Sequence, residues 1–190
     1  MKKNKINEVQ RCAWCKNDPI YIKYHDEEWG VPITDDYKLF EFLILETFQA
    51  GLNWITILRK RENFRKAFSN FDFIKVSKYT DKDLERLMNN DGIIRNRLKI
   101  SAAVVNAGAF CKIRKEFGTF SNYIWAYVDG KTIHSRIKSS TDIPASTPLS
   151  EAISKDLKKR GFKFVGHTVV YSFLQACGLI NDHVEGCFRY

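Results

Sequence analysis

The sequence predicts an all-α protein. Apolar residues recur at the three- and four-residue spacing of helices along most of the chain, and no segment shows the clear alternation of a strand, KTIHSRIKSS (131–140) coming nearest. Hydrophobic residues make up 44% of the 190 residues and aromatic residues 14%, which is enough for a sizeable core. At this length we expect a single unit over residues 1–190, built from two interlocked helical lobes.

Two long helices are predicted on either side of Gly51. Asp35 or Asp36 can cap the first helix, and Gly51 can end it. The apolar positions of this helix are Leu39, Phe40, Leu43, Ile44 and Phe48. The second helix covers about residues 54–68.

Caps and glycines also delimit a shorter and a longer helix further along. Thr80 or Asp81 opens a short helix that continues to about Met88. The longer helix carries regularly spaced apolar residues around 100–110 and is followed by Gly118.

The C-terminal part contains three further helical segments. Ser121 can cap the segment 123–127, and Ser150 can cap a helix that ends at Gly161. The last helix covers about residues 168–177 and is closed by a glycine. Residues 131–148 form the only linker-like stretch, with two of the four prolines.

The charge of the chain favours a polyanionic partner. Lys and Arg number 31 against 22 Asp and Glu, a net charge of +9, which suits nucleic acid and is also compatible with mere solubility. The basic N-terminus MKKNKINEVQR lacks the apolar stretch of a signal peptide, and no run approaches the length of a membrane span. Five cysteines, an odd number, in such a chain predict reduced thiols in the cytoplasm.

Two pairs of potential metal ligands stand near the two ends of the chain. Cys12 and His25 are separated by twelve residues, whereas His183 and Cys187 are four apart, so that a helix or tight turn would place the second pair on one face. Two thiolates and two imidazoles are the ligands of a closed structural zinc site. Cys15 makes a rival C-x2-C pair, so spacing alone leaves Cys15 and His25 as alternatives, and ordinary buried thiols and histidines as a third.

A carboxylate and several aromatic residues suggest a binding pocket. Glu46 shares a helix face with apolar neighbours, where a carboxylate needs a partner or a ligand that supplies positive charge; the alternative is a helix-edge residue that reaches solvent. Aromatic faces stack on nucleobases and attract cations, although a satisfied core is the alternative. The aromatic candidates are Trp14, Tyr21, Tyr24, Trp29 and Trp54.

Two basic, glycine-marked turns resemble phosphate-binding elements. NDGIIRNRLKI (90–100) presents Arg95, Arg97 and Lys99 after Gly92, and amides at the start of the following helix would bind a phosphate. LKKRGFKFVG (157–166) repeats the theme with four basic residues. A solvated charged surface is the alternative for either turn.

Six stretches of the chain together resemble one protein family. They are RCAW, DPIYIKYHDEEWG, LILETFQAGLNWITILRKRENFRKAF, DGIIRNRLKI, ISKDLKKRGFKFVG and YSFLQACGLINDHVEGC, and they span about Cys12 to Cys187. This combination is similar to the bacterial 3-methyladenine DNA glycosylase I family of the helix-hairpin-helix glycosylase superfamily. The resemblance implies an all-helical fold and a role in base-excision repair, in which the N-glycosidic bond of 3-methyladenine in alkylated double-stranded DNA is hydrolysed after base flipping.

The resemblance also assigns a metal site and a base pocket. The metal is one structural zinc ion that joins the N- and C-terminal segments in a zinc-binding lobe, and Cys15 is not a ligand. The implied zinc ligands are Cys12, His25, His183 and Cys187. The implied pocket residues are Trp14, Tyr21, Tyr24, Trp29, Glu46 and Trp54.

Two turns are implied to contact DNA. The helix-hairpin-helix corresponds to the turn at 91–100, and Gly51 and Leu52 are expected to fill the gap left by the everted nucleotide. The implied DNA-contacting residues of the hairpin are Gly92, Arg95, Arg97 and Lys99. The chain departs from the family pattern at Phe48 and Asn53, neither of which is a proposed ligand.

We expect Glu46 to be the catalytic carboxylate, acting more by recognising the methylated base than as a strong general base. No lysine nucleophile is evident, which predicts a monofunctional enzyme that releases free 3-methyladenine without cleaving the strand. We also expect the protein to be a monomer. Two alternatives remain from the residues alone: a non-catalytic helical zinc module that binds nucleic acid, and a glycosylase of broader range that also removes 7-methylguanine.

Overall fold

The computed structural model describes residues 9–190 and is mostly helical, as predicted. Residues 1–8 lie outside the described part. They include most of the basic segment MKKNKINEVQR, so the prediction that this segment is not a signal peptide falls outside the described residues. The α-helices are α1 (Pro19–Glu27), α2 (Asp36–Gln49), α3 (Trp54–Ala67), α4 (Phe73–Val76), α5 (Asp81–Met88), α6 (Arg97–Phe117), α7 (Phe120–Trp125), α8 (Pro148–Lys159) and α9 (His167–Ala176). Short 3-10 helices are η1 (Ala13–Cys15), η2 (Ser69–Phe71), η3 (Ala126–Val128) and η4 (Ser140–Asp142). In the part that is described, no helix is long and apolar enough to cross a membrane.

Three of the predicted helix ends are confirmed by the structure. The Asp35 side chain caps α2 by accepting a hydrogen bond from the Lys38 amide at 2.8 Å. Thr80 and Asp83 form a capping box at the start of α5. The helix α6 ends at Gly118, whose φ of 82° is a conformation that glycine adopts without strain.

The predicted caps of α7 and α8 are wrong. The caps are Thr119 and Thr147, and each threonine hydroxyl accepts a hydrogen bond from the amide three residues later, at Asn122 and Ser150. Ser150 therefore lies in the first turn of α8, behind the proline at its first position. Sequence analysis also missed α1, which Asp18 caps and which begins with a proline.

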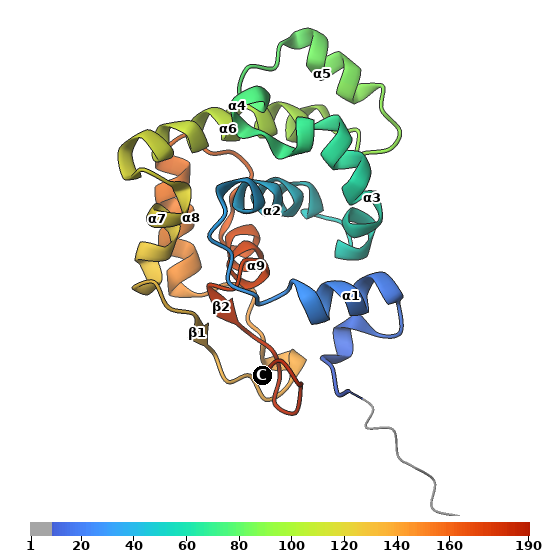
Figure 1. Cartoon of the computed structure of the whole chain (residues 1–190), viewed down its shortest axis with the longest axis vertical. Helices are drawn as coiled ribbons and strands as arrows, with labels where there is room; N and C mark the ends of the chain where they lie inside the picture. Colours follow the sequence, from blue (N-terminus) through green and yellow to red (C-terminus); the bar gives the residue numbers. More distant parts are fainter. Residues whose placement is uncertain (1–8) are drawn as a thin grey trace, which may run out of the picture.

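The helix α2 runs through the centre of the molecule and is buried from Leu39 to Phe48. Figure 1 shows α2 with α3 at one end, α6 above it and α9 below it, and α2 contacts α3, α6, α7 and α9. Aromatic rings fill the space between these helices; Phe110 stacks on Phe120 with centroids 4.1 Å apart and meets Phe40 at 5.2 Å. This core fixes the face of α2 that reaches the functional site.

The N- and C-terminal segments lie side by side at the lower end of Figure 1. The Phe188 amide donates to the Gln10 carbonyl oxygen at 3.0 Å, which joins the two segments directly. The segment predicted to come nearest to a strand contributes β1 (Ile133–His134), which pairs in parallel with β2 (Ile180–Asn181). Because each strand contains only two residues, the fold still belongs to the helical class.

Candidate functional site: an aromatic pocket beside a buried Cys/His cluster

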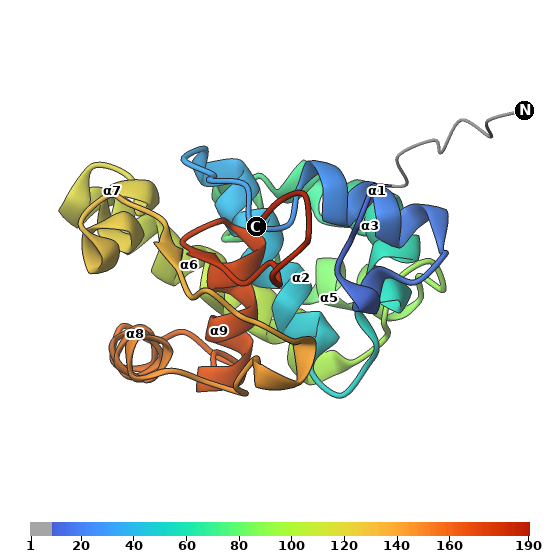
Figure 2. The same ribbon diagram turned by 90° about the horizontal axis from the view of Figure 1, so that it is seen from below.

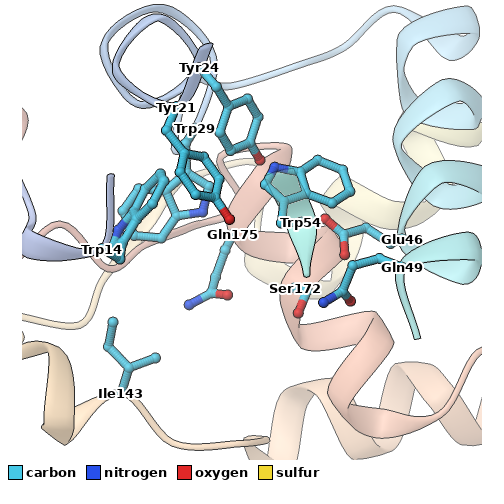
Figure 3. A pocket seen from close by; sticks show the side chains of 10 residues that line it. All are labelled: Trp14, Tyr21, Tyr24, Trp29, Glu46, Gln49, Trp54, Ile143, Ser172 and Gln175. Carbon is cyan, nitrogen blue, oxygen red and sulfur yellow. The ribbon is translucent and has the colours of Figure 1, made fainter. Parts of the chain in front are cut away.

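A pocket of about 240 Å³ lies between α1, α2, α3 and α9 (Figure 3). Pockets for drug-sized ligands hold roughly 300–1,000 Å³, so this volume suits a single heterocycle. All six residues predicted to form a base pocket line it. The lining residues are Trp14, Tyr21, Tyr24, Trp29, Glu46, Gln49, Trp54, Ile143, Ser172 and Gln175.

The aromatic side chains contact one another, Trp14 edge to face with two neighbours and Tyr24 at a tilted angle to Trp54. The Trp14 ring lies 5.5 Å from Tyr21 and 5.0 Å from Trp29, and Tyr24 lies 5.5 Å from Trp54. The buried indole N–H groups of Trp14 and Trp54 have no hydrogen-bond partner within residues 9–190. A flat ligand with acceptor atoms can supply what these donors lack.

Tyr21 also completes the start of α3. Its hydroxyl oxygen accepts a hydrogen bond from the Ile55 amide at 3.0 Å, whereas the side chain of Asn53 makes no capping bond. One of the unpaired amides in the first turn of α3 is thus satisfied by a residue of α1. The bond fixes Trp54, the first residue of α3, against the helix that carries the tyrosines.

Glu46 is buried, so the alternative prediction of a helix-edge carboxylate that reaches solvent is wrong. The side chain is 4% exposed and forms no hydrogen bond with any described residue. Loss of solvation raises its pKa to about 8. Figure 3 shows Glu46 across the pocket from Trp14 and Tyr21. A cationic ligand in the pocket would favour the charged form of this carboxylate.

Sequence analysis missed four of the lining residues. Gln49 lies one turn after Glu46 on α2, and Ser172 and Gln175 lie one turn apart on α9, so helical spacing offered a signal for these three. The Gln175 amide donates to Asp182 at 2.6 Å, and that of Gln49 donates to the Leu52 carbonyl at 2.9 Å. Ile143 comes from the linker-like stretch, and no local pattern marks it.

The structure brings Cys12, His25, His183 and Cys187 together, and all four are buried. Their ligand atoms lie within 4.8 Å of one another. The Cys187 sulfur is 3.4 Å from His25 Nε2 and 3.4 Å from His183 Nδ1, and the Cys12 sulfur is 3.6 Å from the latter. Ligand separations of about 3.4–3.8 Å follow from tetrahedral zinc with Zn–N of about 2.1 Å and Zn–S of about 2.3 Å. The cluster therefore fits a metal ion of that kind, and Cys15 points away, donating to the Cys12 carbonyl at 3.0 Å.

Neighbouring groups orient both histidines. His25 Nδ1 contacts Asp26 at 2.8 Å, and Asp26 is paired in turn with Arg11 at 2.7 Å. His183 Nε2 contacts the Trp29 carbonyl at 3.0 Å. These contacts leave one nitrogen of each ring for the cluster. Burial lowers the pKa of His183 to about 4 and that of His25 as well, which favours the neutral imidazoles that bind metals.

The pocket and the cluster share a wall. Trp29 lies 4.5 Å from the His183 ring, and Trp14 lies 5.4 Å from the His25 ring. Both tryptophans line the pocket. An ion that fixes the histidines would also fix these two rings.

The predicted DNA-contacting residues lie in two connections and in the first turn of α6. Gly92 and Arg95 lie between α5 and α6, Arg95 is exposed, and Arg97 forms an ion pair with Glu85 at 2.6 Å. In the α2–α3 connection Leu52 is 38% exposed.

Lys99 is the exception, because the structure contradicts a direct DNA contact for it. The side chain is 7% exposed. Its ammonium donates to the carbonyl oxygens of Phe48 at 2.9 Å and Ala50 at 2.6 Å. Lys99 thus holds the end of α2 and is not available to a phosphate.

These features define a class of protein: a helical protein with a buried carboxylate in an aromatic pocket of about the size of one heterocycle, beside a buried Cys2His2 cluster. The family described as methyladenine glycosylase matches residues 14–190. The chain is 51% identical over 182 residues to DNA-3-methyladenine glycosylase 1 of Escherichia coli, which covers 96% of this chain and 97% of the relative. It is 47% identical over 177 residues to DNA-3-methyladenine glycosylase of Haemophilus influenzae, covering 93% and 96%. This chain therefore belongs to the methyladenine glycosylase family.

Solved structures agree with this assignment. A crystal structure of a 3-methyladenine DNA glycosylase I matches with a TM-score of 0.91 at 54% identity, covering 94% of this chain and 98% of the other. A structure of the Staphylococcus aureus enzyme, described as the basis of 3-methyladenine recognition, matches with a TM-score of 0.92 at 40% identity, covering 95% and 96%. The fold therefore extends over nearly the whole of both chains.

Proposed function

We propose that this protein is a base-excision repair glycosylase that hydrolyses the N-glycosidic bond of 3-methyladenine in alkylated DNA. The observation that carries the proposal is the buried Glu46 carboxyl in an aromatic pocket sized for one base. The relatives that share about half of the sequence act on 3-methyladenine, as their names state.

Recognition rests on charge and shape. A nucleotide methylated at N3 of adenine is cationic, and the enzyme first extracts it from the stack, which costs a few kcal/mol. The rings of Trp14, Tyr21, Tyr24, Trp29 and Trp54 enclose the base. Because Glu46 has a pKa of about 8 in the empty pocket, the arriving cation favours its ionised form and a proton is released.

Catalysis then depends on loss of the base. A carboxylate that only stabilised the cationic base would raise the barrier to its departure as a neutral molecule. Glu46 therefore acts mainly as the group that selects the base, and it also stabilises the developing positive charge on the sugar. No lysine is among the lining residues, which supports a monofunctional reaction that uses water, releases free 3-methyladenine and leaves the strand intact.

A structural zinc ion held by Cys12, His25, His183 and Cys187 completes the proposal. Four protein ligands leave no position for a catalytic water, so the ion would supply rigidity and no chemistry. Ion binding would make the chain one unit, because the N- and C-terminal segments together form the zinc-binding lobe.

Double-stranded DNA is the proposed macromolecular partner. The α5–α6 connection would act as a helix-hairpin-helix that binds the backbone through Gly92, Arg95 and Arg97, and Gly51 and Leu52 would fill the gap left by the flipped nucleotide. We propose a monomer, since one chain supplies the whole pocket, and a cytoplasmic location, since the five cysteines are unpaired.

Chromatography of the bases released from methylated duplex DNA tests this function. Release of 3-methyladenine with little 7-methylguanine supports it. Release of both bases would indicate a broader glycosylase. No release by a folded, zinc-loaded sample would favour a non-catalytic module that binds modified bases.

A further inference from the structure

The side-chain amide of Gln175 lies in the wall of the pocket, and its two ends have different surroundings. The nitrogen donates a hydrogen bond to a carboxylate oxygen of Asp182 at 2.6 Å. The amide oxygen forms no hydrogen bond with any of residues 9–190. Figure 3 shows this oxygen turned towards Ser172 and the nitrogen turned away from it. Gln175 therefore presents an acceptor to the side of the pocket where Ser172 lies.

Asp182 determines which end of this amide faces the pocket. A carboxylate oxygen accepts hydrogen bonds and does not donate them, so the nitrogen of Gln175 has to face Asp182. Asp182 is 1% exposed, and the Tyr171 hydroxyl donates to the same carboxylate oxygen. Its other oxygen is buried and has no partner within the described chain. A turned amide would place the Gln175 oxygen against the carboxylate and leave further buried acceptors without a donor.

The main chain on both sides of this pair is fixed as well. Gln175 lies in the last turn of α9, and its carbonyl oxygen accepts from the Gly30 amide at 3.0 Å, next to the pocket residue Trp29. Asp182 directly follows β2, which pairs with β1, and directly precedes His183 of the Cys/His cluster. The orientation of the Gln175 amide therefore depends on the C-terminal segment.

The pocket thus has an acceptor on each of two helices. Glu46, once ionised, supplies one from α2, and Gln175 supplies the other from α9. Figure 3 shows them on either side of Ser172. A base that fills the pocket has to bring N–H donors to this side, because a buried acceptor without a donor is costly.

Adenine and guanine differ in what they offer to such acceptors. Adenine carries an amino group, with two N–H donors, at the position where guanine carries a carbonyl oxygen. In a nucleotide whose adenine is methylated at N3, this amino group supplies all the N–H donors of the base, because N9 is bonded to the sugar. Two acceptors match its two N–H groups, and both would oppose a carbonyl oxygen.

We propose that Gln175 accepts a hydrogen bond from the amino group of the methylated base, and that Asp182 is the positioning residue that keeps the Gln175 oxygen turned towards this group. The two residues then select against bases with a carbonyl oxygen at the same position. The inference rests on the proposed function, since that function makes 3-methyladenine the occupant of the pocket. It adds a selecting group on α9 to Glu46 on α2.

Binding of two free bases, measured by quenching of the tryptophans that line the pocket, tests the inference. The bases are 3-methyladenine and 3-methylhypoxanthine, which carries a carbonyl oxygen in place of the amino group. The unmodified protein should prefer 3-methyladenine. Gln175→Met keeps the length of the side chain without the acceptor, so it should bind 3-methyladenine about tenfold more weakly and lose no affinity for 3-methylhypoxanthine. Gln10→Met, at an exposed position, is the matched control and should bind both bases normally.

Asp182→Asn separates positioning from folding. An asparagine offers a donor as well as an acceptor, so the Gln175 amide can turn and face the pocket with its nitrogen. The preference for 3-methyladenine should then fall about threefold or more, because the first base binds more weakly and 3-methylhypoxanthine binds more tightly. A loss of stability alone would not tighten the binding of either base. In the Gln175→Met background, Asp182→Asn should have no further effect on the preference.

Three results would overturn the inference. An unmodified protein that binds both bases equally would mean that the pocket does not read this position. Normal binding of 3-methyladenine by Gln175→Met, or an equal loss for both bases, would show that the Gln175 oxygen does not contact the amino group. An effect of Asp182→Asn that is as large with Gln175→Met as without it would assign that effect to folding. The proposed function fails separately, if the unmodified protein releases no 3-methyladenine from methylated DNA.

Discussion

The Lys99 ammonium lies 2.6 Å from the carbonyl oxygen of Ala50 and 2.9 Å from that of Phe48, at the end of α2. Helices end in carbonyl groups without intrahelical partners, and a cation there is favourable. Ala50 leads into Gly51 and Leu52, whose connection joins two pocket-lining helices. One buried lysine therefore links the start of α6 to the edge of the base pocket.

Replacing this lysine should loosen the α2–α3 connection. Lys99→Met should lower stability by about 2 kcal/mol and the melting temperature by about 4–8 °C, because charged hydrogen bonds to two carbonyls are lost. Release of 3-methyladenine from DNA should fall more than binding of the free base, since Glu46 and the aromatic rings stay in place. Lys115→Met on the same helix is the control, and equal losses in both variants would contradict a specific role for Lys99.

Glu46 should make stability depend on pH. Its folded-state pKa of about 8 lies above the value of about 4.3 in an unfolded chain, so its contribution is present below pH 4 and is lost as pH rises towards 8. The free energy of unfolding of Glu46→Gln, relative to that of the unmodified protein, should thus rise by about 1.4 kcal/mol for each pH unit between pH 5 and 7.5. Urea unfolding across this range measures the difference, and parallel stability curves would contradict the burial of the charge.

The same substitution should impair recognition. Glu46→Gln keeps the shape of the side chain but removes the charge that complements a cationic base, so release of 3-methyladenine from DNA should fall about tenfold or more. Glu62→Gln, at an exposed position of α3, is the control and should release the base at the normal rate. Normal release by Glu46→Gln would mean that the aromatic rings alone select the base.

Local patterns predicted most of the helices, though not α1, and most of the pocket, because helical spacing and caps are local. The cap at Asp35 and the carboxylate at Glu46 were visible in this way. The role of Lys99 was not, because its acceptors lie 51 and 49 residues away in sequence, and a lysine in a basic turn has the same local pattern whether it faces DNA or a helix end. Ile143 was missed for the same reason, since only the tertiary fold brings the linker-like stretch to the pocket.

The metal site offers a test of whether His25 or Cys15 is the ligand that accompanies Cys12. His25→Ala should lose the ion and melt at a lower temperature, since structural zinc contributes to folding. Cys15→Ser should keep the ion, because its sulfur contacts a backbone carbonyl and lies outside the cluster. Metal analysis after dialysis measures both. Retention of zinc by His25→Ala with loss in Cys15→Ser would restore the C-x2-C assignment.

The ion pair between Arg97 and Glu85 allows the DNA contact of the α5–α6 connection to be tested from both partners. Arg97→Ala should weaken binding of duplex DNA and lower the salt slope by about 1, because one phosphate contact is lost. Glu85→Gln frees the same guanidinium and should strengthen binding or leave it unchanged. If both variants weaken binding with an unaltered slope, the pair serves to hold α5 against α6 and does not contact the phosphate, because only a lost phosphate contact changes the number of released counterions.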